Sequence, residues 1–314
     1  LHCLEGGTRM ELGFIGLGRM GGNMVTRLLA KPAIRVVVHD RAEPSMAALV
    51  ALGARAAGSP AQLVSLLSGT PRVIWLMLPA GDVTEEIYRQ VREQLGAGDI
   101  LIDGANSNHR DTSRRAAECA ERGIRLLGVG VSGGIVAADS GYPMMIGGDA
   151  AACEHCLPVF EALGLEQGHA RVGDDPSSGH YVKMVHNAIE YGMMQAIAEG
   201  FDLLQNGSVK GLDLARIAGL WNHGTIVSSF LMQMTANALA RDGDLSGVAP
   251  YVADSGEGRW AAIEAMENGV PFVANTYALH ARYQSRDPNS LALRLLSAMR
   301  REFGGHAVKP VGTD

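Results

Sequence analysis

The chain has 314 residues, 47% of them hydrophobic, which suffices for the cores of about two globular domains. Its net charge of −6 argues against nucleic acid and anionic membrane surfaces as general partners. No apolar run approaches the roughly 18 residues that a membrane span requires. Residues 1–9 lack the apolar centre of a signal peptide, and we expect them to be a vector-derived leader, with Met10 the natural start.

The cysteines predict reduced thiols and no metal. Cys3 and Cys119 stand alone, and Cys153 and Cys156 have the spacing of a zinc-binding or redox pair. A structural zinc site needs four ligands, and the chain offers no second pair to complete one. Free thiols are usual in the reducing cytoplasm, so we expect a cytoplasmic protein.

The first strand, predicted at 10–16, leads into a glycine-rich turn and a helix at 22–30, and a second strand follows at 35–40. The turn reads Gly16-Leu17-Gly18-Arg19-Met20-Gly21. In this setting GxGxxG is typical of a dinucleotide site, whereas alone it is weak evidence. Gly16 permits the tight turn, Gly18 lets the backbone approach the pyrophosphate, and Gly21 allows close packing of helix on strand. The helix N-terminus would then bind the phosphates.

Asp40 ends the second predicted strand. A carboxylate at this place accepts hydrogen bonds from the adenosine ribose hydroxyls and repels a 2′-phosphate. Arg41, the next residue, has the chemistry to bind such a phosphate or to stack on adenine. We therefore expect NAD to be preferred, with NADP as the alternative.

The alternation of helices and strands continues, with strands predicted at 72–78, 100–103 and 125–131 and late strands at 143–147 and 165–172. Loops that follow strands of a parallel sheet lie at its ligand-binding edge. Here they supply Leu78, Pro79 and Ala80, then Asn106, then Ser132, Gly133 and Gly134. The Ser-Gly-Gly turn exposes N–H groups and a hydroxyl that suit a carboxylate or a sugar hydroxyl.

A polar, glycine-containing linker at 173–179 ends the strand pattern. We therefore predict an α/β Rossmann-type, doubly wound domain at 10–175. Residues 176–314 should form an all-α domain, which the family resemblance described below implies to serve substrate binding and oligomerisation.

A long helix is predicted from Gly179 to about Asn206, with no proline in it. Five polar residues recur along one face at i, i+3, i+4, i+7 and i+8, a spacing that usually marks an apolar stripe. They are Lys183, His186, Asn187, Glu190 and Tyr191. The stripe is either a solvent-exposed face or the floor of an active site.

Further cations lie in the helical part of the chain. Arg259 belongs to the glycine-containing segment 254–260, Arg282 to a predicted helix, and Arg300 and His306 to the C-terminal tail. Each alone is typical of a solvated surface. Together with Lys183 they have the chemistry to bind a phosphate.

Four segments closely resemble 6-phosphogluconate dehydrogenase, decarboxylating, in its short form within the 3-hydroxyacid dehydrogenase superfamily. They are 16–24, 103–107, 130–134 and 179–192, and the likeness runs from about Met10 to the C-terminus. The helix that carries Lys183 and Tyr191 is its most specific part. The 254–260 loop and the 303–306 tail are similar as well.

The resemblance implies oxidation and decarboxylation of 6-phosphogluconate to ribulose 5-phosphate and CO2, a reaction of the pentose phosphate pathway. It implies Lys183 as general base and Glu190 as general acid, with Asn187 at the reacting centre. It further implies substrate contacts from Asn106, Ser132, Gly133, Gly134, His186, Asn187 and Tyr191. Arg282 matches a phosphate-binding arginine, Arg259 lies near the family's phosphate-binding lysine, and Arg300 and His306 match residues of a tail that reaches a neighbouring subunit's site.

Departures from the family bear on cofactor and assembly. Asp40 stands where NADP-dependent members carry Asn, which favours NAD. Residues 135–139 depart from the usual continuation of the Ser-Gly-Gly turn. The long form of the family has a duplicated helical domain, so this shorter chain is expected to form a homodimer or homotetramer.

Two other functions remain open. A 3-hydroxyisobutyrate-type dehydrogenase acts on a smaller acid and would not need Arg282, Arg300 or His306. A non-catalytic NAD-binding sensor would keep the fold alone, and the intact set of Lys183, Asn187 and Glu190 argues against it.

Overall fold

The computed structural model describes residues 10–304 and 307–309, so the expectations for residues 1–9 and for His306 lie outside the described part. The chain forms two compact units, of which unit 1 ends at His186 and unit 2 begins at Asn187. The junction falls within the long helix α9 (Ser177–Asn206), so the first turns of α9 pack with unit 1. The domain boundary expected from sequence lies just before this helix.

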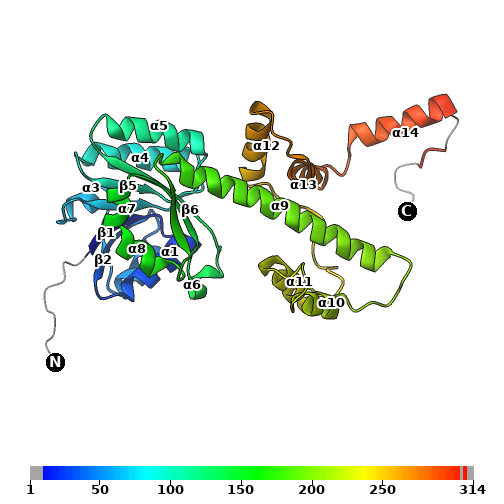
Figure 1. Cartoon of the computed structure of the whole chain (residues 1–314), viewed down its shortest axis with the longest axis horizontal. Helices are drawn as coiled ribbons and strands as arrows, with labels where there is room; N and C mark the ends of the chain where they lie inside the picture. Colours follow the sequence, from blue (N-terminus) through cyan, green and yellow to red (C-terminus); the bar gives the residue numbers. More distant parts are fainter. Residues whose placement is uncertain (1–9, 305–306, 310–314) are drawn as a thin grey trace. The chain divides into compact units, whose positions relative to one another are not determined.

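Unit 1 is built on an eight-stranded sheet with the order β3-β2-β1-β4-β5-β6-β7-β8 (Figure 1). Neighbouring strands are parallel except β6 and β7, which are antiparallel. The strands are β1 (Met10–Ile15), β2 (Ile34–His39), β3 (Arg55–Ala56), β4 (Val73–Leu76), β5 (Ile100–Asp103), β6 (Arg125–Val131), β7 (Met144–Gly148) and β8 (His169–Gly173). This arrangement confirms the predicted Rossmann-type α/β fold.

Helices cover both faces of the sheet. One face carries α1 (Arg19–Leu29), α2 (Glu43–Val50), α6 (Ala137–Ser140), α7 (Ala150–His155) and α8 (Leu157–Leu163), and the other carries α3 (Pro60–Ser65), α4 (Asp82–Gln94) and α5 (His109–Ala120). Strand side chains alternate between the two cores, so Trp75 packs on the first and its neighbour Ile74 on the second. The Trp75 ring stacks on Phe14 with centroids 5.9 Å apart.

Residues 150–163 form two helices, α7 and α8, with a break at Cys156. Pro158 explains the break, because it has no N–H and its ring clashes with the carbonyl four residues earlier.

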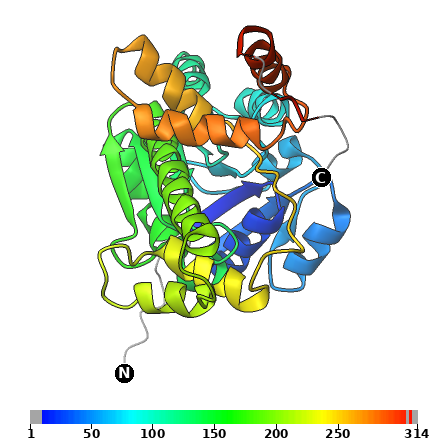
Figure 2. The ribbon, with the colours of Figure 1, turned by 90° about the vertical axis from the view of Figure 1, so that its right-hand side faces the viewer.

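The described part of unit 2 is helical. After α9 it contains α10 (Leu214–Trp221), α11 (Phe230–Arg241), α12 (Glu257–Glu267), α13 (Val273–Gln284) and α14 (Leu291–Gly304). Helix α10 packs on α11 and α12 packs on α13 (Figure 2). No helix of the described chain has the length and apolar character needed to cross a membrane.

Candidate active site

The glycine turn after β1 has the geometry of a phosphate-binding turn. Gly16 has φ +98°, and a Cβ there would lie 2.2 Å from the carbonyl oxygen of Met77. A Cβ on Gly21 would lie 2.0 Å from the carbonyl oxygen of Gly16, so only glycine lets α1 touch the turn. By contrast, a Cβ on Gly18 would meet no atom within 4 Å. The open approach over Gly18 and the first N–H groups of α1, which no described side chain caps, fit a dinucleotide pyrophosphate.

Asp40 lies at the end of β2, beside this turn. Its Oδ2 accepts a hydrogen bond from the Leu17 N–H at 2.6 Å, and its Oδ1 accepts one from the Ala42 N–H at 2.8 Å. Each carboxylate oxygen has a further lone pair with which to accept a ribose hydroxyl. Asp40 thus ties the glycine turn to β2, a second task that its place in the sequence does not reveal. Arg41 is exposed beside it.

The parallel strands bring the other predicted loop residues to the same edge of the sheet. The carboxyl ends of β1, β2, β4, β5 and β6 share this edge, because all five strands run in one direction. The loops that follow carry Leu78, Pro79, Ala80, Asn106, Ser132, Gly133 and Gly134. Pro79, Ala80 and Asn106 are exposed there. The cofactor residues predicted from sequence therefore lie on one edge of unit 1.

A buried ion pair supports the turn that presents Asn106. Asp103, at the end of β5, is 1% exposed and accepts a hydrogen bond from Arg115 Nη1 at 2.8 Å. The same carboxylate accepts the Ala105 N–H at 3.1 Å and the Ser107 hydroxyl at 3.0 Å. Both neighbours of Asn106 are therefore held by one carboxylate. Sequence reasoning missed Arg115, because an arginine among other charged residues on a helix usually faces solvent.

His180 joins the first turn of α9 to helix α5. It is 2% exposed, and its Nδ1 lies 2.8 Å from the Thr112 hydroxyl. Burial lowers the pKa of His180 and outweighs the opposing effect of nearby Asp103, so the imidazole is neutral at physiological pH. This residue too was absent from the sequence prediction.

Helix α9 lies directly on the backbone of β6, and this contact places Lys183. A Cβ on Gly130 would lie 2.4 Å from Lys183 Cβ and 2.8 Å from the Gly179 carbonyl oxygen. A Cβ on Gly179 would lie 2.1 Å from the carbonyl oxygen of Gly128. Lys183 is only 8% exposed, and its Nζ donates to the Ser132 hydroxyl at 3.3 Å. The structure thus brings the predicted base to the Ser-Gly-Gly turn.

The polar stripe of α9 continues into unit 2, where it holds the loop before α12. Asn187 Nδ2 donates to Glu257 Oε1 at 2.6 Å. The Tyr191 hydroxyl lies 3.1 Å from Ser255 Oγ, and Tyr191 is 5% exposed. The Arg282 guanidinium stacks over the Tyr191 ring at 3.5 Å and donates to the Ala253 carbonyl at 2.9 Å.

The other predicted residues of the stripe and loop are placed as follows. His186 and Glu190 are half-buried on α9, and Arg259 is exposed in the first turn of α12. The sequence did not predict a role for Glu257, since glycines on either side of it are typical of a flexible surface loop.

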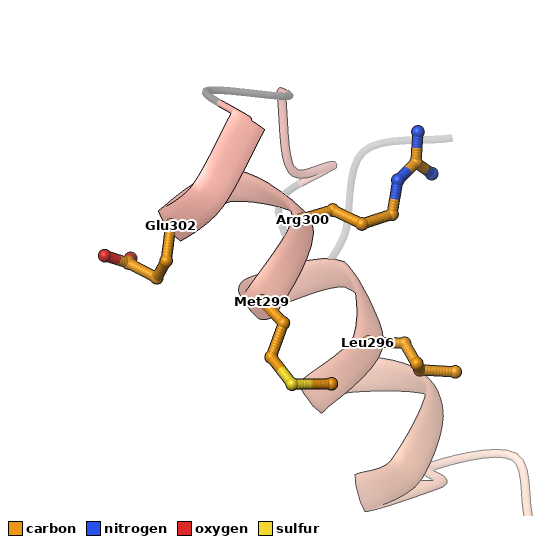
Figure 3. A pocket seen from close by; sticks show the side chains of 4 residues that line it. All are labelled: Leu296, Met299, Arg300 and Glu302. Atoms are coloured by element: carbon orange, nitrogen blue, oxygen red, sulfur yellow. The ribbon is translucent and has the colours of Figure 1, made fainter.

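Arg300 lies on α14, in a surface hollow lined by Leu296, Met299, Arg300 and Glu302 of that helix (Figure 3). The side chains of Arg300 and Glu302 point to opposite sides of the helix. No other predicted site residue lines this hollow among the described residues. The described chain therefore does not by itself show Arg300 at the site.

Three cysteines are buried in the described chain. Cys119, Cys153 and Cys156 are free thiols, and burial raises the pKa of Cys156 to about 12. Among residues 10–304 and 307–309, no group of three or more His, Cys, Asp or Glu side chains could hold a metal ion.

The chain combines a Rossmann-type sheet that carries a dinucleotide turn with a helix that places a buried lysine against a Ser-Gly-Gly turn. This combination defines a nicotinamide-dependent dehydrogenase. The family model for the NAD binding domain of 6-phosphogluconate dehydrogenase matches residues 11–172, and the model for the C-terminal domain of that enzyme matches residues 179–290. The chain belongs to the 6-phosphogluconate dehydrogenase family.

Individual relatives agree with this assignment. The NAD(+)-dependent, decarboxylating 6-phosphogluconate dehydrogenase of Haloferax volcanii is 40% identical over 95% of this chain and 98% of its own length. The enzyme of the same name from Bacillus subtilis is 34% identical over 88% of this chain and 61% of its own length. The solved 6-phosphogluconate dehydrogenase of Plasmodium falciparum has a TM-score of 0.80 at 29% identity, covering 97% of this chain and 67% of its own.

A solved 3-hydroxyisobutyrate dehydrogenase from Salmonella typhimurium has a TM-score of 0.73 at 22% identity, covering 89% of this chain and 95% of its own. That likeness shows a shared fold.

Proposed function

We propose that the chain oxidises and decarboxylates 6-phosphogluconate to ribulose 5-phosphate and CO2, with NAD as the electron acceptor. The observation that carries this proposal is the contact of buried Lys183 with Ser132 at the edge of a dinucleotide-binding sheet. A base held at this edge lies where parallel sheets bind nicotinamide cofactors and their substrates.

The residues of α9 supply the proton transfers. NAD, when bound, accepts the hydride that leaves C3 of the substrate. Lys183, in its neutral form, takes the proton of the 3-hydroxyl, and as an ammonium it then donates a hydrogen bond to the C3 oxygen while CO2 leaves. Glu190 donates a proton to C1 of the resulting enediolate, which thereby becomes the ketone. One proton is removed and one is added, so the proton balance of the reaction closes.

The remaining predicted residues bind and orient the sugar acid. We assign its carboxylate and hydroxyls to the polar groups Asn106, Ser132, Gly133, Gly134, His186, Asn187 and Tyr191. We assign the binding of the phosphate to the cations Arg259, Arg282, Arg300 and His306. Arg282 is best supported, because its guanidinium is already ordered by the Tyr191 ring and a backbone carbonyl.

The base is tested with Lys183→Met, which keeps the length and apolar stem of the side chain and removes the amine. Loss of a general base costs roughly 100- to 10,000-fold in turnover. NADH formation from 6-phosphogluconate measures the loss, with Lys210→Met as the control, since Lys210 bonds only the exposed Asn206 carbonyl in the described contacts. Turnover of Lys183→Met within tenfold of wild type would contradict the assignment.

The acid is tested separately. Glu190→Gln should block protonation at C1, so NADH can still form in a first turnover while ribulose 5-phosphate does not accumulate. Unaltered production of ribulose 5-phosphate would argue against Glu190.

The preference for NAD is inferred from Asp40. Asp40→Asn removes the charge that repels a 2′-phosphate, so kcat/KM with NADP should rise relative to that with NAD. The ratio of kcat/KM with NADP to kcat/KM with NAD is the measurement to use. The same change weakens the hydrogen bonds of Asp40 with Leu17 and Ala42, so it lowers kcat/KM with both cofactors. A ratio unchanged from wild type would refute the preference.

We also propose a homo-oligomer, a homodimer or homotetramer, in which the C-terminal tail completes a neighbouring site. Leu291, Leu293, Leu295, Leu296 and Met299 of α14 are 43–70% exposed, an apolar surface that a second copy would remove from water. The double variant Leu295→Asp, Leu296→Asp should have the mass of a monomer by light scattering and should show reduced activity. An unchanged mass would refute α14 as the interface.

We place the protein in the cytoplasm, a location that its free thiols support.

A further inference from the structure

The carboxamide of Asn187 has two chemically opposite ends, and what it offers to a substrate depends on how it is turned. Oδ1 only accepts hydrogen bonds and Nδ2 only donates them. Asn187 follows Lys183 by four residues on α9, so both side chains lie on one face of the helix. The orientation of this amide therefore matters to the proposed reaction.

Glu257 determines that orientation. Its Oε1 accepts a hydrogen bond from Asn187 Nδ2 at 2.6 Å, and the two residues are seventy positions apart in the chain. An ionised carboxylate accepts and never donates, so Nδ2 must face Glu257. Oδ1 consequently lies on the opposite edge of the amide, where it can act only as an acceptor.

Glu257 is itself held in place. It is the first residue of α12, follows Gly256 at φ +110°, and is 3% exposed. The positive end of the helix dipole and the Asn187 amide both stabilise a carboxylate there, which offsets the cost of burying it.

The loop before Glu257 is fastened to the same face of α9. The Tyr191 hydroxyl lies 3.1 Å from Ser255 Oγ, and the Gly256 N–H donates to Asp254 Oδ1 at 2.9 Å. A Cβ on Gly258 would lie 2.6 Å from the Tyr191 ring, so glycine is needed for the ring to pack against the start of α12. Glu257 is thus a fixed partner on a braced turn.

We infer that Glu257 is a positioning residue for the dehydrogenase reaction: it locks the Asn187 carboxamide so that Oδ1 accepts from a donor group of the substrate. The inference rests on the proposed function. Because Glu257 acts through the Asn187 amide, which we assign to the substrate, it should act on turnover and leave the KM for NAD unchanged.

Glu257→Gln is the primary test. Glutamine has the same shape, yet its amide either donates or accepts, so the Asn187 amide is no longer held in one orientation. We expect kcat with 6-phosphogluconate to fall about tenfold, the equivalent of about 1.4 kcal/mol, with KM for NAD within about twofold of wild type. Glu267→Gln, at the exposed end of the same helix, is the matched control and should leave both values unchanged.

A double-mutant cycle separates positioning from a general structural effect. In an Asn187→Leu background the Glu257→Gln change should cost no further turnover, because the amide that it orients is gone. An equal loss of kcat in both backgrounds, or wild-type kcat in Glu257→Gln, would overturn the inference.

The proposed function fails in a different way. Wild-type protein that forms no NADH from 6-phosphogluconate refutes that function, and with it the role of Glu257. Wild-type turnover together with an unimpaired Glu257→Gln variant refutes the positioning role alone.

Discussion

Replacing Gly130 by alanine should displace the proposed base, Lys183, while leaving its side chain chemically unchanged. The added methyl would lie 2.4 Å from Lys183 Cβ, about 1 Å inside ordinary van der Waals contact, and 2.8 Å from the Gly179 carbonyl oxygen. These atoms belong to a helix turn and a strand backbone, which cannot rotate away as a flexible side-chain end can. The first turns of α9 must therefore shift from β6 by roughly 1 Å.

The size of the effect follows from that shift. Overpacking of this kind costs about 1–3 kcal/mol of unfolding free energy. A misplacement of about 1 Å at a reacting group costs about 100-fold in rate. We expect Gly130→Ala to lose about 1–3 kcal/mol in urea unfolding and about 100-fold in kcat, measured as NADH formation.

Gly200→Ala is the matched control for this change. Gly200 lies on the same helix α9, is exposed, and has open space where its Cβ would be. Alanine there should stabilise the helix by up to about 1 kcal/mol and leave kcat unchanged. A Gly130→Ala enzyme with wild-type kcat would refute the claim that this glycine positions Lys183, and wild-type stability would refute the packing argument itself.

Two further predictions concern unit 1. Arg115→Met should cost about 3–5 kcal/mol of unfolding free energy, because it leaves the carboxylate of Asp103, which is 1% exposed, buried without its cation. Arg89→Met, in an exposed pair, is the control and should cost less than about 1 kcal/mol. Equal losses of unfolding free energy in urea would refute this reasoning. Burial tends to raise the pKa of Asp99, but the hydrogen bonds that it accepts from Arg72 and from the Gly96 N–H together outweigh burial and hold that pKa below the usual value. Asp99 therefore contributes stability above about pH 4 that is lost as the pH falls through the lowered pKa. Asp99→Asn should weaken the dependence of the unfolding free energy on acid pH. Parallel curves of unfolding free energy against pH for wild type and variant would contradict this prediction.

Local pattern in the sequence determined much of the fold and part of the site. The turn from Gly16 to Gly21 is recognisable because its chemistry is contained in six consecutive residues, and the structure gives Gly16 and Gly21 a steric reason. The polar stripe from Lys183 to Tyr191 is recognisable because one helix spaces it. Strand runs and the loops at their carboxyl ends predict that Asn106 and Ser132 lie on one edge of the sheet.

Only the tertiary structure decided which residues support those groups. Arg115, His180 and Glu257 resemble ordinary surface or loop residues in sequence, yet each is at most 3% exposed. Their partners lie 12 to 70 positions away and are brought close by the order of the strands and the packing of α9. A buried polar group acquires its role from the atoms that replace water around it, and those atoms are specified only when the chain is folded.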